Sequence, residues 1–101
     1  MMKTRFLEIA DLELADTIRY YEQERIALGA EFHEEVNEAL DRIEQMPFAW
    51  SRLGKDIRVC RTKRFPYGLV YQIRGNEAVI IAVMHLHRRP GDWRNRLKND
   101  H

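Results

Sequence analysis

The chain has 101 residues, of which 45% are hydrophobic and 33% are charged, and its formal net charge is +1. These values predict one globular domain over residues 1–101, with a core that needs no disulfide or metal. Cys60 is the only cysteine, which excludes an intrachain disulfide framework and a CxxC site. No apolar run is long enough for a membrane span or a signal peptide, so we expect a cytoplasmic protein that starts at Met1 or Met2.

The small net charge hides a large asymmetry between the two halves. Residues 1–50 contain 5 Lys and Arg against 12 Asp and Glu, a net charge of −7, whereas residues 51–101 contain 12 against 4, a net charge of +8. One interpretation is that an acidic helical half packs beside a basic half. We favour a basic surface that binds an acidic partner, because the basic residues cluster at the ends of predicted strands.

The first elements predicted are a strand and a helix. Residues 3–9 alternate weakly and indicate a first strand. Asp11 is the expected N-cap of the helix that follows. Its buried stripe would be formed by Leu14, Ile18 and Tyr21, at i, i+4 and i+7.

A second helix is predicted from about residue 30 to residue 46, after a turn at Gly29 and before Pro47. Its apolar face would comprise Phe32, Val36, Ala39, Leu40 and Ile43. Its solvated face would comprise Glu34, Glu35, Glu38, Asp41, Arg42 and Glu44. Two helices joined this tightly should form an antiparallel hairpin. Residues 48–55 then indicate a connector, with Trp50 expected as a core residue.

Three strands are predicted in the second half, at residues 57–62, 68–74 and 78–84. Gly75-Asn76 between the last two is a two-residue hairpin signal. The last strand is apolar on both faces, which predicts that both faces are covered. Asp92 would cap a short final helix through residue 98. The order β-α-α-β-β-β, with a possible short C-terminal helix, predicts an α+β fold with a helical hairpin on a small, mostly antiparallel sheet.

His85 and His87 lie on one side of an extended segment, but two ligands are too few for a metal site, and we expect no metal or cofactor. His85 is either a general acid or base, or a hydrogen-bonded histidine at a strand end. The second interpretation is favoured. Cys60 is best interpreted as a small core residue.

A basic set comprises Arg58, Arg61, Lys63 and Arg64, accompanied by Tyr67 and Tyr71. Arginine binds carboxylate or phosphate with two parallel hydrogen bonds, and tyrosine can stack on a nucleobase. The set therefore fits RNA phosphates or an acidic peptide, and these two alternatives stay open.

Three motifs together resemble the RelE/ParE superfamily of toxins from bacterial type II toxin–antitoxin modules. They are Arg64-Phe65-Pro66-Tyr67, Ala82-Val83-Met84-His85, and the pattern R-x-P-x-x-W-x-x-R, with Arg88 or Arg89 first and Trp93 and Arg96 later. The helical segment 20–47 is also similar to this family. The resemblance implies a helical hairpin against an antiparallel sheet.

The superfamily implies two functions. RelE-like members cleave mRNA on the ribosome, and the corresponding set here would be Arg61, Arg64 and His85. ParE-like members bind and poison DNA gyrase without such chemistry. This chain looks closer to ParE, because no tyrosine follows Tyr71 and because the patterns RFPY and H-x-x-R-x-P-x-x-W are more similar to that branch. Either branch implies a hetero-oligomer with a cognate antitoxin that carries an acidic segment. The expected target- or antitoxin-binding residues are Arg58, Arg61, Lys63, Arg64, Tyr67, Arg88, Arg89, Trp93 and Arg96.

Overall fold

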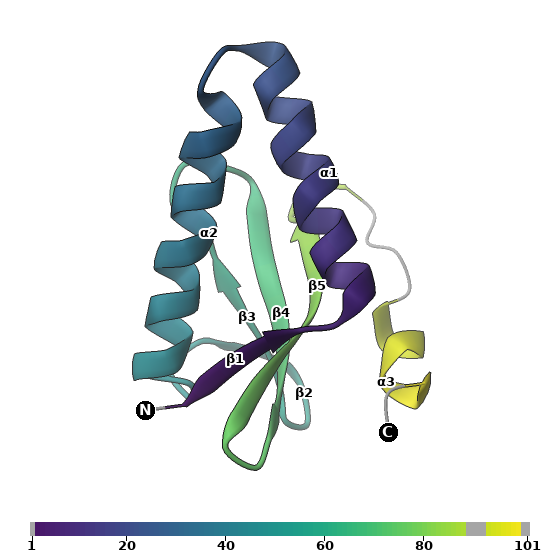
Figure 1. Ribbon diagram of the computed structural model, residues 1–101. Helices are drawn as coiled ribbons and strands as arrows, with labels where there is room; N and C mark the ends of the chain where they lie inside the picture. Colours follow the sequence, from purple (N-terminus) through teal and green to yellow (C-terminus); the bar gives the residue numbers. More distant parts are fainter. Residues whose placement is uncertain (1, 89–92, 100–101) are drawn as a thin grey trace.

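The computed structural model describes residues 2–88 and 93–99. Along the chain the elements are β1 (Lys3–Phe6), α1 (Glu8–Glu24), α2 (Leu28–Gln45), β2 (Ser51–Gly54), β3 (Ile57–Arg61), β4 (Tyr67–Arg74), β5 (Glu77–His85), a 3₁₀ turn (Trp93–Asn95) and α3 (Arg96–Asn99). Figure 1 shows the two long helices as a hairpin in front of the sheet. No helix in the described part of the chain is both long and apolar enough to cross a membrane.

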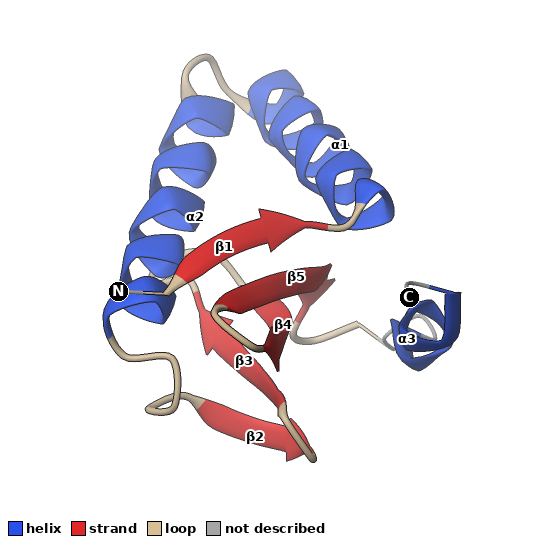
Figure 2. Cartoon of the chain, turned by 60° about the horizontal axis from the view of Figure 1, so that its bottom comes forward, coloured by secondary structure: helices blue, strands red, loops and turns tan. Residues whose placement is uncertain are grey.

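The sheet has five strands in the order β1-β5-β4-β3-β2. β1 pairs with β5 in parallel, and the other pairs are antiparallel. Figure 2 shows α1 and α2 on one side of the sheet, with α3 apart from them. The expected α+β architecture, with a hairpin on a mostly antiparallel sheet, is therefore confirmed. The turn at Gly75-Asn76 is also confirmed, and Gly75 has the positive φ, 58°, that such a turn requires.

The helical hairpin differs from the prediction at two points. α1 begins at Glu8, with Leu7 as its N-cap, so Asp11 lies in the first turn and is not the cap. The reason is that the Leu7 N–H is hydrogen-bonded to the Ile80 carbonyl at 2.9 Å, so the helix starts directly from the sheet.

The interhelical turn was also placed wrongly. It passes through Ala27, whose φ is 71°, and Gly29 lies inside α2. The lack of a side chain at Gly29 allows close helix packing, because a Cβ there would lie 2.5 Å from the Ile18 carbonyl oxygen.

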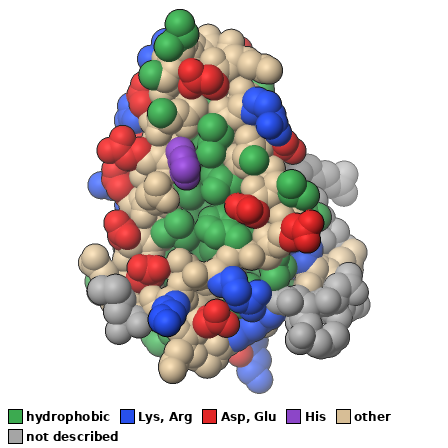
Figure 3. Space-filling view, viewed as in Figure 1, with side chains coloured by type: hydrophobic (Ala, Val, Ile, Leu, Met, Phe, Trp, Pro, Cys, Tyr) green, Lys and Arg blue, Asp and Glu red, His purple; other side chains and the backbone are tan. Residues whose placement is uncertain are grey.

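The main core lies between the hairpin and the sheet. Phe32, Val36, Ala39 and Ile43 of α2 are all fully buried, as their spacing predicts. Tyr21 and Ile18 of α1 pack against this core while partly exposed. Figure 3 shows apolar side chains between the two helices and acidic side chains along their outer sides.

A second, smaller core covers the other face of the sheet. It contains Ile81, Ala82 and Val70, and Trp93 packs against them with 5% of its surface exposed. The β4–β5 register shifts between Val70 and Tyr71, so that Ile81 is the extra residue of a bulge. Both faces of β5 are therefore covered, as its composition predicts.

The sequence prediction missed β2, which was interpreted as a connector. Ser51–Gly54 has only four residues, and its exposure pattern has a single half-buried position, Leu53. Such a segment carries no clear two-residue period, and its pairing with β3 makes it a strand. Trp50, just before it, is half-buried against the main core and donates its Nε1–H to the Arg42 carbonyl at 3.2 Å.

Candidate functional site

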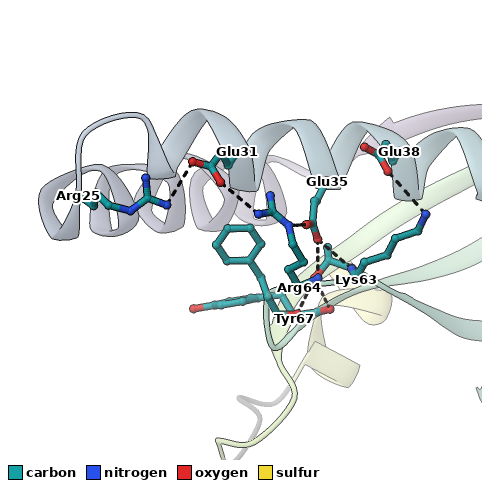
Figure 4. A network of polar contacts seen from close by, with 9 residues as sticks. Arg25, Glu31, Glu35, Glu38, Lys63, Arg64 and Tyr67 are labelled. Atoms are coloured by element: carbon teal, nitrogen blue, oxygen red, sulfur yellow. Dashed lines mark hydrogen bonds and ion pairs between the residues drawn. The ribbon is translucent and has the colours of Figure 1, made fainter.

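The loop between β3 and β4 carries Lys63 and Arg64 and is bound to α2 by Glu35 (Figure 4). One carboxylate oxygen of Glu35 accepts the backbone N–H groups of Lys63 and Arg64, both at 2.9 Å. The other accepts the Arg64 Nε–H at 2.5 Å. Glu35 is only 6% exposed, so its expected place on the solvated face of α2 was wrong.

Ionisation of Glu35 is maintained by these donors. Burial by itself would raise the pKa of Glu35, but the hydrogen bonds from Arg64 and Lys63 outweigh it and hold the pKa below its ordinary value. The side chain of Thr62 also braces the loop, since its hydroxyl donates to the Phe65 carbonyl at 2.7 Å. The loop is thus held both by its own hydrogen bonds and by the contacts of Lys63 and Arg64 with Glu35 of α2.

The positive charges of this loop are matched by acidic residues of α2. Arg64 also lies 3.2 Å from Glu31, and the Lys63 ammonium lies 4.0 Å from Glu38. Hydrogen bonds from Arg64, ahead of those from Arg25, lower the pKa of Glu31. For Lys63 and Arg64, the interpretation that an acidic helical half packs beside a basic half therefore applies.

Tyr67 is not available as a stacking surface. It is 7% exposed, and its ring contacts Phe32 and Tyr21 edge-on, with centroids 5.2 and 6.1 Å away. Phe65 completes this aromatic cluster beneath the hairpin. The sequence identified Tyr67 as a binding residue, and the structure places its ring in the core.

His85 ends β5 beside Tyr67, with ring centroids 5.0 Å apart. Its Nδ1 atom accepts the backbone N–H groups of His87 and Arg88, both at 3.1 Å. Partial burial, followed by the charges of Arg88 and His87, lowers the pKa of His85. A neutral ring with Nδ1 as acceptor carries its proton on Nε2, so His85 caps the turn that leaves the sheet.

Trp93 and Arg96, which the sequence analysis expects to bind a partner, are not exposed. Trp93 lies in the second core, and the Arg96 side chain is 17% exposed. Arg96 binds Glu13 of α1 through two hydrogen bonds of 2.9 and 2.8 Å, and it also donates to the Ile81 carbonyl at 2.9 Å. This contact links the C-terminal segment to α1 and β5.

The same pair completes the edge of β5 beyond the end of β1. Glu13 accepts the Val83 N–H at 3.0 Å, while Arg96 donates to the Ile81 carbonyl. Together the two side chains satisfy edge groups that another strand would otherwise pair with. The sequence gives no sign of this pair, because Glu13 and Arg96 are 83 positions apart.

The other predicted residues lie at the margins of this region. Arg61 is exposed at the end of β3, and Arg88 is exposed after β5. Arg58 donates to the Trp50 carbonyl at 2.9 Å on the far edge of the sheet. Arg89 lies outside the described residues. Arg61 and His85 lie at the same end of the sheet, where β3 and β5 end beside the start of β4, and Arg64 in the adjoining loop is engaged by carboxylates.

Within residues 2–88 and 93–99, no three His, Cys, Asp or Glu side chains come together as a metal site. Cys60 is buried and its thiol faces the Ala39 carbonyl oxygen at 3.9 Å. Burial raises the pKa of this thiol, so Cys60 is a core residue, as predicted.

A helical hairpin on a small, mostly antiparallel sheet, joined to it by ion pairs, places the chain among the α+β proteins. The family model of the ParE toxin of the type II toxin–antitoxin system parDE matches residues 5–90, which is most of the chain. The protein belongs to this family. The resemblance inferred from the sequence motifs is therefore confirmed.

A solved structure supports the same fold. The protein is similar to a chain of the "Chromosomal ParDE TA system from P. aeruginosa", with a TM-score of 0.58 and 13% sequence identity. The match covers 82% of this chain and 94% of the other. A search of curated proteins gives no match.

Proposed function

We propose that this protein is the toxin of a type II toxin–antitoxin module, that it acts in the cytoplasm, and that it inhibits DNA gyrase by binding it without catalysing a reaction. Membership of the ParE toxin family supports the first part of the proposal. The solved relative belongs to a ParDE system, which supports a cognate antitoxin as a partner.

The observation that carries the non-enzymatic mechanism is the state of His85. Cleavage of RNA through the 2′-hydroxyl requires a group that accepts a proton. In His85, Nδ1 already accepts the N–H groups of His87 and Arg88, and Nε2 carries the ring proton. His85 therefore has no nitrogen lone pair available for a substrate proton.

Arg64, another member of the alternative nuclease set, supports the same proposal. The Arg64 guanidinium contacts Glu35 and Glu31, so a substrate phosphate would have to compete with two carboxylates for it. Binding of a protein target requires neither a proton acceptor nor a phosphate site.

The test compares two activities of one preparation. The purified protein is added to DNA gyrase in a supercoiling assay, and to ribosomes carrying mRNA in a cleavage assay. We expect inhibition of supercoiling and intact mRNA. His85→Gln should keep the inhibition, because the glutamine oxygen can accept the same two N–H groups. His33→Gln, at an exposed position of α2, is the matched control.

Expression in a sensitive host extends the test to cells. We expect growth arrest with a DNA-damage response and with translation still active, and relief of the arrest by the cognate antitoxin. Cleavage of ribosome-bound mRNA at specific positions, lost in His85→Gln, would instead establish the RelE-like endoribonuclease.

A further inference from the structure

Two arginines lie directly opposite each other at the outer edge of the sheet. The β2–β3 register pairs Arg52 with Arg58, so both side chains point to the same face of the sheet. Within the described part of the chain, neither has a carboxylate within ion-pair distance. Like charges in directly opposed positions destabilise a sheet, so a carboxylate from another molecule that paired with both side chains would relieve this repulsion.

The neighbours of Arg58 leave its charge in place. Its guanidinium donates to the Trp50 carbonyl at 2.9 Å and lies 5.7 Å from the centre of the Phe48 ring. Arg42 of α2 is similar, since it donates to the Arg61 carbonyl at 2.7 Å and lies 6.0 Å from the Trp50 ring. Carbonyl oxygens and aromatic rings orient a guanidinium without neutralising it.

Exposed apolar side chains lie beside these arginines. Met46 is 59% exposed and Phe48 is 64% exposed, although both are large. The segment that presents them is held in place, because Tyr71 donates its hydroxyl to the Pro47 carbonyl at 2.5 Å. Burial, followed by the neighbouring Cys60, raises the pKa of Tyr71 to about 12, so this hydroxyl remains a donor well above neutral pH.

We call this region the arginine–aromatic patch; it comprises Arg42, Met46, Phe48, Trp50, Arg52 and Arg58. Arginine, methionine and aromatic residues are the types enriched at protein–protein interfaces. We propose that the patch binds a short acidic segment of a partner protein. Carboxylates of the segment would pair with Arg52 and Arg58, and one apolar side chain of it would cover Met46 and Phe48.

Charge complementarity favours a peptide over a nucleic acid. Glu34, Glu38 and Asp41 are exposed along the turns of α2 that precede Arg42. A long phosphate backbone that reached the patch along α2 would meet these like charges, whereas a short acidic segment would not. The inference rests on the proposed function, in which the protein acts by binding other proteins. It assigns the arginine–aromatic patch as the surface that binds one such partner.

The experiment measures binding of a fluorescein-labelled peptide of alternating glutamate and leucine to the intact protein. A glutamine–leucine peptide and an oligouridylate of the same length are the comparison probes. We expect the acidic peptide alone to bind, and the double variant Arg52→Ala, Arg58→Ala to weaken this binding by roughly tenfold or more. Phe48→Ser should also weaken it. Equal binding of the glutamine–leucine peptide, or binding of the oligouridylate lost in the double variant, would overturn the inference.

Arg19→Ala is the matched control, because Arg19 is an exposed arginine of α1 whose partner is the carboxylate of Asp16. It should bind the acidic peptide as the unmodified protein does. Arg52→Glu guards against a folding artefact. It supplies a carboxylate opposite Arg58, so it should lose peptide binding while its thermal midpoint stays the same or rises.

Failure of this inference can be separated from failure of the proposed function. If the protein arrests growth and is neutralised by its antitoxin, but the double variant binds the acidic peptide unchanged, the patch inference is wrong and the toxin proposal stands. If the patch binds the peptide as expected but the protein inhibits neither growth nor gyrase, the patch inference stands and the toxin proposal fails.

Discussion

Lys63, Arg64 and Arg96 face carboxylates, whereas Arg42 and Arg58 face carbonyl oxygens and aromatic rings. Both groups belong to the positive charge that the sequence suggests for a basic surface. The first group pairs with Glu35, Glu38 and Glu13 of the hairpin, and its arginines join the β3–β4 loop and the C-terminal segment to the helices. The second group keeps its charge and lies beside exposed apolar side chains. The formal charge of the sequence therefore overstates the basic surface where arginine and lysine face the helical hairpin. It describes the basic surface well beside β2 and β3.

The largest expected effect is on the first group. Glu35→Ala removes the acceptor of two backbone N–H groups and of Arg64, so the free energy of unfolding should fall by about 2–4 kcal/mol. Urea denaturation measures this change. Glu34→Ala, at the exposed neighbouring position, should change it by less than about 0.5 kcal/mol. Equal effects of the two variants would mean that the loop does not depend on Glu35.

Removal of the Arg96–Glu13 contact should lower the free energy of unfolding by somewhat less than Glu35→Ala does. Arg96→Ala leaves the Glu13 carboxylate and the Ile81 carbonyl without their shared donor, so we expect a loss of about 1–3 kcal/mol. Arg94→Ala is the control on the same segment, where the guanidinium lies 4.3 Å from the Trp93 ring. That change should cost about 1 kcal/mol or less. A larger loss from Arg94 than from Arg96 would contradict the structural role given to the Glu13 pair.

Acidic pH should remove the stabilisation that the ionised Glu35 carboxylate gives to the β3–β4 loop. The pKa of Glu35 in the folded protein lies below its ordinary value of 4.5, because hydrogen bonds from Arg64 and Lys63 outweigh burial. The resulting stabilisation is complete above pH 4.5 and is lost as the pH falls through the lower, folded-state pKa. Denaturation curves between neutral and acidic pH should show the unmodified protein approaching Glu35→Gln as the pH falls. A constant difference between the two would contradict this assignment.

The smallest expected effect has the opposite sign and concerns the second group. Arg52→Glu replaces a directly opposed like pair by an opposite pair with Arg58, so stability should rise by about 0.2–1 kcal/mol. Lys55→Glu, at an exposed position in the neighbouring turn, should leave stability within about 0.5 kcal/mol of its starting value. Loss of stability in Arg52→Glu would show that Arg52 already has a stabilising role within the fold.

The sequence by itself determined the elements whose signals are local. The apolar spacing of Phe32, Val36 and Ile43 predicts the buried face of α2, and Pro47 predicts its end. Gly75-Asn76 predicts the hairpin turn because few residues adopt a positive φ. These features depend on neighbours within a few positions of the chain, and the combination of motifs was enough to identify the family.

Only the tertiary structure decided which polar and aromatic side chains are exposed. Glu35 and Lys63 are 28 positions apart, and Glu13 and Arg96 are 83 apart, so no local pattern connects them. Trp93 is buried because the second face of the sheet needs a cover, and Arg52 lies opposite Arg58 because β2 pairs with β3. Burial and ion pairing are properties of surfaces brought together by folding. The same arginine can therefore be a structural contact or a binding residue, depending on which segment the fold places beside it.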